Sequence, residues 1–86
     1  MRKYQIAKLE GYKFYFKYEP SNPDLLHIYI RHLTTVKDTL KVFFNSEPIY
    51  NEKYDRYENS NETHTIFWNW INEPEKIIMI ITCFKL

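Results

Sequence analysis

The chain has 86 residues, with 12 Lys and Arg against 11 Asp and Glu for a net charge of +1, and its 2 Trp, 8 Tyr and 6 Phe contrast with one glycine, Gly11. Nucleotide-cradling loops, dinucleotide fingerprints and hydrolase nucleophile elbows need several glycines at fixed spacing, so the composition excludes these kinds of site. A chain of this length supports one modest core, and we expect a single domain over residues 1–86.

The charges are distributed unevenly along the chain. Residues 1–42 hold eight basic and four acidic side chains, a net of +4, whereas residues 43–86 hold four and seven, a net of −3. We therefore expect an anion-binding surface, if there is one, in the first half. The single cysteine, Cys83, cannot form an internal disulfide, and no signal peptide or membrane-spanning run is evident, which predicts a cytoplasmic protein without a membrane partner.

Three strands are predicted in the first third of the chain. Residues 3–9 and 12–18 form an expected hairpin, because the even-numbered residues of the second segment are all aromatic and should pack inward. Residues 19–24 hold two prolines and three turn-forming residues and predict a loop. Residues 25–32 alternate between two faces and predict a third strand.

One helix and three further strands complete the predicted fold. Residues 35–45 begin with a variant of the capping box and continue with apolar residues at helical spacing. Strands are expected over residues 49–58, 63–71 and 76–84, and the last should be central because it is apolar on both faces. The predicted order is βββαβββ, an α+β domain with a mainly antiparallel sheet.

The strongest chemical cluster is His27, Arg31 and His32. Alternation places His27 and Arg31 on one face of the expected strand, and His32 falls at its junction with the helix. Metal-independent RNA cleavage needs a base, an acid and a cation near the phosphorus, and histidine and arginine can supply all three. The alternative interpretation is an ordinary solvated strand face followed by a polar junction residue.

A second constellation joins Arg56 to His64. A hairpin between Glu58 and Thr63 would bring the two side chains together across adjacent strands, where they could complete the same site. The alternative is cross-strand Arg–Glu pairing with surface aromatics, and exposed pairs of this kind contribute little to stability.

Lysines and tyrosines alternate in the first hairpin. The ammonium groups of Lys13 and Lys17 could pair with phosphates, and a base could stack on the ring of Tyr15. The neighbouring residues that could make the same contacts are Lys3, Lys8, Tyr4 and Tyr12. Such residues are equally standard on an exposed strand face. Trp68 and Trp70 share a face and indicate a core stripe or, alternatively, a stacking platform.

Neither a metal site nor a cofactor is expected. The three histidines are accompanied by one cysteine, and no Cys-x-x-Cys or His-Glu-x-x-His spacing exists. Cys83 lies in an apolar strand, where an inert core thiol is the simplest interpretation.

Five short segments together resemble one group of nucleases. They are His27 to His32, a helix ending Val42-Phe43-Phe44, Arg56-Tyr57, His64 to Trp68 and Ile80 to Lys85. This order, covering about residues 27–85, resembles the RelE-like and BrnT-like small ribonuclease toxins of the broader barnase, EndoU and colicin-nuclease assemblage. The chain departs from those toxins in its near-neutral charge and in its first hairpin.

The resemblance implies a helix before a curved antiparallel sheet whose basic and histidine residues cut RNA without a metal. Arg31-His32 looks like the basic-His pair that precedes the helix, Arg56 like the cation opening the next hairpin, and Lys85 like a basic residue closing the last strand and touching RNA. His27 or His32 would be the general base and His64 the acid or orienting group.

The leading hypothesis is therefore a metal-independent endoribonuclease of toxin or effector type, from a phage or bacterium, with RNA as partner. The protein partners to expect are a cognate antitoxin, a host complex or a second copy of the chain in a homodimer. The competing hypothesis is a non-catalytic binding protein, such as a phage-encoded inhibitor of a host defence complex or a small nucleic-acid adaptor.

Overall fold

Seven strands and two helices make up residues 3–86, the part of the chain that the computed structural model describes. In chain order they are β1 (Tyr4–Leu9), β2 (Tyr12–Glu19), β3 (Asn22–Leu26), α1 (His27–His32), α2 (Val36–Phe44), β4 (Ile49–Asn51), β5 (Arg56–Ser60), β6 (His64–Asn72) and β7 (Ile77–Lys85). The sheet order is β1-β2-β7-β6-β5-β4, with β3 added to β2 outside this path. Strands β2 and β7 run parallel and the other pairs antiparallel, which confirms the predicted α+β class.

The first hairpin forms as the alternation predicts. Leu9 pairs with Tyr12, and the two turn residues Glu10 and Gly11 have φ of 55° and 83°, as a two-residue hairpin loop of type I′ requires. Phe14 and Phe16 are buried on one face, whereas Tyr15 between them points to the other.

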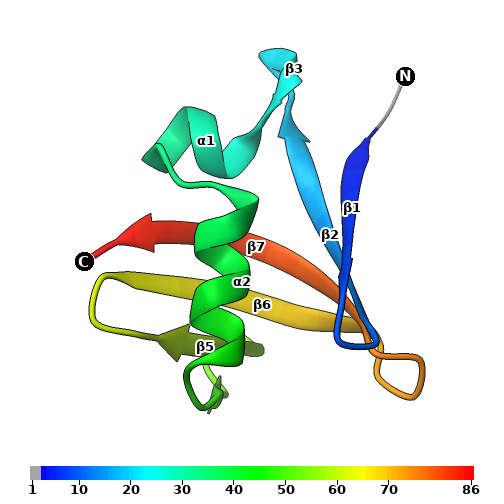
Figure 1. The fold of residues 1–86 in the computed structure, drawn as a ribbon, viewed down its shortest axis with the longest axis vertical. Helices are drawn as coiled ribbons and strands as arrows, with labels where there is room; N and C mark the ends of the chain where they lie inside the picture. The colour runs from blue at the N-terminus through cyan, green and yellow to red at the C-terminus, as the bar shows by residue number, and fades with distance from the viewer. Residues whose placement is uncertain (1–2) are drawn as a thin grey trace.

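Helix α2 forms for the local reason that the sequence gives. Thr35 accepts a hydrogen bond from the Asp38 backbone N–H, and the Asp38 carboxylate accepts one from the Thr35 N–H, so the capping box is complete. The helix crosses in front of β6 and β7 and covers one face of the sheet (Figure 1). We call the opposite face, which α2 does not cover, the open face.

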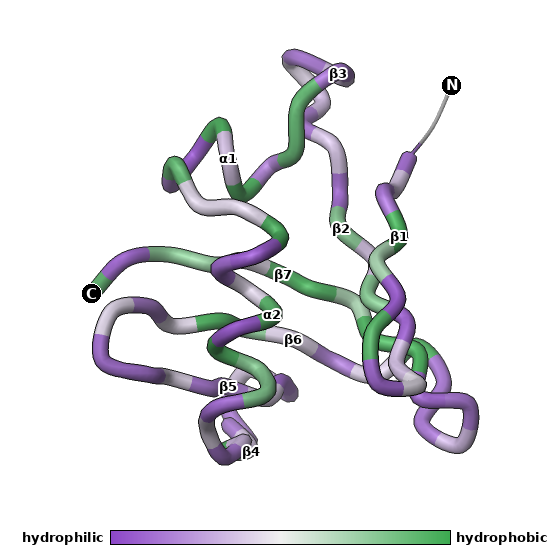
Figure 2. Tube along the Cα trace, in the orientation of Figure 1, coloured by the Kyte–Doolittle hydropathy of each residue, from purple (hydrophilic) through white to green (hydrophobic). Residues whose placement is uncertain are grey.

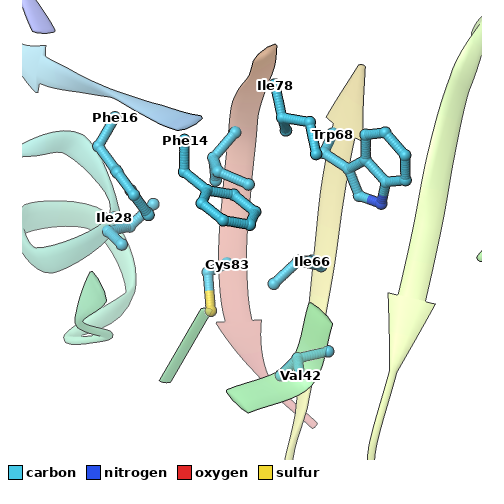
Figure 3. Packing of buried hydrophobic residues seen from close by; sticks show 9 residues of the cluster. Phe14, Phe16, Ile28, Val42, Ile66, Trp68, Ile78 and Cys83 are labelled. Carbon is cyan, nitrogen blue, oxygen red and sulfur yellow. The ribbon is translucent and has the colours of Figure 1, made fainter. Parts of the chain in front are cut away.

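The core lies between α2 and the sheet. Its buried apolar residues come from both helices and from β2, β6 and β7, and eight of the nine are labelled in Figure 3. Strand β7 is central as predicted, and Figure 2 shows the apolar residues concentrated along it. Ile66 and Trp68 are buried and Trp70 is partly buried against them, which confirms the core-stripe interpretation for β6. Cys83 is fully buried, and that burial raises the pKa of its thiol.

Residues 19–32 differ from the prediction. The expected loop is the end of β2, a tight turn and β3, and the expected strand over residues 25–32 ends at Leu26, where α1 begins. The reason is tertiary: β2 and β7 pair only over four residues each and then diverge, and α1 fills the gap between them (Figure 1). Ile28 anchors this short helix in the core, and Leu33 ends it with a φ of 55°.

The expected strand over residues 49–58 is interrupted. Residues 52–55 turn, with Asp55 at a φ of 49°, so the segment forms the β4–β5 hairpin instead of one strand. The element order is therefore βββααββββ. Within residues 3–86, no helix has the length and apolarity needed to span a membrane.

Candidate functional site

The end of β2 places a carboxylate beneath α1. Glu19 is the last residue of β2, next to a register shift in the β2–β3 pairing, and only 3% of it is exposed. His27 and Arg31 are four residues apart on α1 and therefore lie on the same side of the helix. Both side chains reach Glu19, although the sequence predicted this shared face on a strand.

The contacts to Glu19 are close and directional. Arg31 donates from Nε to Oε2 at 3.0 Å and from its second guanidinium nitrogen to Oε1 at 3.4 Å, while His27 Nδ1 lies 3.2 Å from Oε2. The Arg31 hydrogen bond is the largest of the effects that hold the pKa of Glu19 below its ordinary value, and His27 adds to it. Glu19 is therefore ionised at neutral pH and takes part as an acceptor only.

The ionised carboxylate decides the tautomer of His27. Because Glu19 can only accept, Nδ1 of His27 must carry the hydrogen in their contact. In the neutral ring this leaves Nε2 with a free lone pair, which is the arrangement that a general base needs. The His27 side chain is 31% exposed, so the buried Glu19 orients a ring that solvent and a ligand can still reach.

His27 and Arg31 line a hollow of about 510 Å³ on the open face, at the place where β2 and β7 diverge. The lining residues are Tyr4, Lys17, Glu19, Pro20, His27, Arg31, Met79, Ile80 and Ile81. Arg31 is 59% exposed while it holds Glu19, so its guanidinium also faces solvent. The hollow thus joins a hydrogen-bonded histidine to two cations, Arg31 and Lys17.

His32 lies beside this cluster. Its ring centroid is 6.4 Å from that of His27 at an interplanar angle of 79°, and it also contacts the ring of Phe84 at 5.9 Å. His32 is exposed at the last position of α1. Two imidazoles and a guanidinium from one short segment therefore lie together, as the sequence suggested.

Arg56 and His64 do not come together, which corrects the expected second constellation. The β5–β6 hairpin forms, but Arg56 lies on the open face, where it donates to Glu58 at 2.9 Å and covers the ring of Phe67 at 3.6 Å. His64 lies on the α2 side, with Nδ1 2.7 Å from Thr63 Oγ1 and Nε2 3.9 Å from an Asp38 oxygen. The two side chains occupy opposite faces and opposite ends of the hairpin.

Arg56 pairs with Glu58 of its own strand, and the two side chains are only 22% and 28% exposed, so the exposed cross-strand pair of the alternative interpretation does not form either. Hydrogen bonds from Asn51 and then from Arg56 hold the pKa of Glu58 below its ordinary value. The Arg56 guanidinium is thus paired with an anion and stacked on a ring, and it lines none of the walls of the hollow at α1.

The lysine–tyrosine surface of the first hairpin forms in part. Lys13, Tyr15 and Lys17 are on the open face, and the Tyr15 ring lies 5.8 Å from that of Tyr4. Tyr12 turns to the α2 side, where its ring contacts Phe43 at 5.2 Å. Lys85 pairs in register with His64, also on the α2 side, and so lies apart from the other predicted RNA contacts.

Glu19 is the site residue that the sequence analysis missed. The prolines at 20 and 23 placed it in a loop, and a glutamate beside a turn normally faces solvent. The signal that was present is the spacing of His27 and Arg31, which fits one face of a helix as well as one face of a strand. Between residues 3 and 86, no three His, Cys, Asp or Glu side chains are grouped to hold a metal ion.

Comparison with family models, curated proteins and solved structures finds no match to this chain. The resemblance to RelE-like and BrnT-like toxins therefore stays a prediction from the sequence.

Proposed function

We propose that the protein is a metal-independent endoribonuclease whose active site is the hollow at α1. The observation that carries the proposal is the buried Glu19 carboxylate, which orients His27 and binds Arg31 next to a second imidazole, His32. An oriented base, a neighbouring acid and a cation are the groups that this reaction requires.

In the proposed reaction His27 is the general base and His32 is the general acid. His27 accepts the proton of the RNA 2′-hydroxyl through Nε2, and the 2′-oxygen attacks the adjacent phosphorus. The bond from phosphorus to the 5′-oxygen breaks, and protonated His32 gives its proton to that oxygen. The products are a 2′,3′-cyclic phosphate and a 5′-hydroxyl, and exchange with water restores both imidazoles.

The cations act on the phosphate. Arg31 is fixed by Glu19 and still largely exposed, so it can donate to the oxygens of the phosphorane as negative charge builds there. Lys17 lines the same hollow from β2 and can pair with the same phosphate or its neighbour. Glu19 is a positioning residue, because it acts through His27 and Arg31.

The test is cleavage of a fluorogenic RNA by purified protein, with and without EDTA. We expect cleavage that EDTA leaves unchanged, and a loss of about 100-fold to 10,000-fold in rate for His27→Ala and for His32→Ala. His64→Gln is the matched control, because it alters a histidine on the other face and should retain activity. RNA left intact by the wild type, or cut equally by the histidine variants, would overturn the proposal.

The second candidate is a non-catalytic binding protein, and one observation favours it. An apolar groove of about 820 Å³ lies between the first hairpin and α2, lined by Leu9, Val36, Leu40 and Phe44 among others. Leu9 is 44% and Phe44 37% exposed, so the groove presents apolar surface to solvent. Under this alternative, Phe44→Glu would abolish function in cells and His27→Ala would not, the opposite of what the nuclease proposal requires.

A further inference from the structure

We infer that the open face of the first hairpin binds single-stranded RNA in preference to duplex and leads it into the hollow at α1. The inference rests on the proposed function and adds the substrate class. We call this surface the hairpin platform, and it consists of Tyr4, Ile6, Lys8, Lys13, Tyr15 and Lys17.

The register of the hairpin gathers these six side chains on one face. Tyr4 pairs with Lys17, Ile6 with Tyr15 and Lys8 with Lys13, so each cross-strand pair projects to the same side. Strand β1 is at the edge of the sheet, which leaves the platform open along one side.

The rings of the platform are partly accessible. Tyr4 is 37% exposed, its neighbour Ile6 is 46% exposed and Tyr15 is half-buried. The centroids of Tyr4 and Tyr15 are 5.8 Å apart, with their planes tilted by 56°. Because the two rings are tilted and not stacked on each other, both keep surface against which a base can pack. Stacking on aromatic side chains is how proteins bind unpaired bases without reading their sequence.

The charge of the platform suits a phosphate backbone. Three of its six residues are lysines and none is acidic, in a chain whose overall charge is only +1. Tyr4 and Lys17 also line the hollow at α1, so the platform is continuous with the proposed active site. A single-stranded RNA lying on the platform would therefore extend into the hollow and place a phosphate near Arg31.

The ring and charge pattern distinguishes single strands from duplex. In duplex RNA the bases are paired and stacked within the helix, so only phosphates and sugars could reach this surface. The tyrosines would then add nothing, and lysine contacts alone would remain. A single strand can use the rings and the lysines together.

Binding is measured separately from cleavage by fluorescence anisotropy with a short, labelled 2′-O-methyl oligonucleotide, which has no free 2′-hydroxyl to attack. The single strand is compared with its duplex over a series of salt concentrations. We expect the single strand to bind more tightly, Tyr15→Leu and Tyr4→Leu each to weaken it by about 5-fold to 150-fold, and Tyr15→Phe to bind like wild type. Tyr50→Leu, an exposed tyrosine on the α2 side, is the matched control and should bind like wild type.

The lysines give a second, independent measure. Each of Lys8, Lys13 and Lys17 changed to Gln should reduce the slope of log affinity against log salt by about 0.7. Lys37→Gln and Lys41→Gln on α2 are the controls and should leave the slope unchanged. Circular dichroism of each variant is measured to check that the fold is retained.

The outcomes separate this inference from the proposed function. Equal affinity for duplex, or binding that ignores the tyrosines, would refute the platform even if RNA is cleaved. Tyrosine-dependent binding with no cleavage of ordinary RNA would uphold the platform and refute the nuclease. No binding to either RNA would refute the platform and leave the surface for a protein partner.

Discussion

Replacing Phe43 by alanine tests how the core is built around α2. The Phe43 ring lies edge-on to Phe14 at 5.0 Å, to Tyr12 at 5.2 Å and to Trp68 at 5.4 Å. Truncating a core phenylalanine costs about 3 to 5 kcal/mol, and ring–ring contacts of this geometry add about 0.5 to 1.5 kcal/mol beyond their buried area. Because Phe43 is half-buried, we expect the lower end of the range, about 3 kcal/mol.

The comparison with Leu40→Ala sharpens the test. Leu40 is also half-buried, but it lines the apolar groove and makes none of these ring contacts, so we expect the lower end of the range for leucine, about 2 kcal/mol. Phe43→Leu, which retains volume and removes the ring, should fall between wild type and Phe43→Ala. The free energy of unfolding is measured by urea titration, and the melting temperature should fall by about 4 to 8 °C per kcal/mol. Equal losses for Phe43→Ala and Leu40→Ala would refute the aromatic cluster as the main support of α2.

Three further predictions follow from buried polar groups. Asn59→Ala should lower the free energy of unfolding, measured by urea titration, by about 1 to 3 kcal/mol. The buried Trp68 Nε1–H donates to Asn59 Oδ1 at 2.8 Å and would lose its acceptor. A smaller loss would mean that another acceptor replaces it. Because the pKa of Glu19 is lowered in the folded protein, its contribution to stability is complete above the ordinary glutamate pKa of about 4.3 and is lost as pH falls through the lower folded pKa. Glu19→Gln should therefore reduce the loss of stability at acid pH. Equal losses of stability at acid pH for the two proteins would contradict this. Cys83 should react with iodoacetamide only after unfolding, because burial raises the pKa of its thiol and blocks access; prompt alkylation of the native protein, followed by mass spectrometry, would argue against that burial.

Elements with a strong local signal could be predicted from the sequence. The capping box of Thr35 and Asp38 determines where α2 begins whatever its surroundings, and the Glu10-Gly11 turn with its flanking alternation determines the first hairpin. Strand β7 is apolar on both faces because it lies at the centre of the sheet, and that position could be predicted as well.

Helix α1 could not be predicted, because its six residues fit two periodicities. Leu26, Ile28 and Ile30 alternate as in a strand, while His27 and Arg31 are spaced as on one side of a helix. The divergence of β2 from β7 decides between them, since it leaves a gap that a helix fills, and no local signal reports that divergence.

The arrangement of the candidate site could be predicted from the sequence only in part. His27, Arg31 and His32 are close in sequence and stay together in either structure. The proximity of Arg56 to His64 required both the register of a hairpin and the correct face, and the sheet places them on opposite faces. Glu19 contacts two residues of α1, and that helix was not predicted from the sequence.

The most direct test of the proposed reaction is the chemistry of the cleaved ends. An RNA with a single ribonucleotide in an otherwise 2′-deoxy strand is incubated with the protein in EDTA, and the products are identified by mass spectrometry. Attack by the 2′-oxygen with His27 as base and His32 as acid predicts one cut, directly after the ribonucleotide, with a 2′,3′-cyclic phosphate on one product and a 5′-hydroxyl on the other. Cleavage at deoxynucleotides, products with a 5′-phosphate, or an intact strand would contradict the assignment of this site.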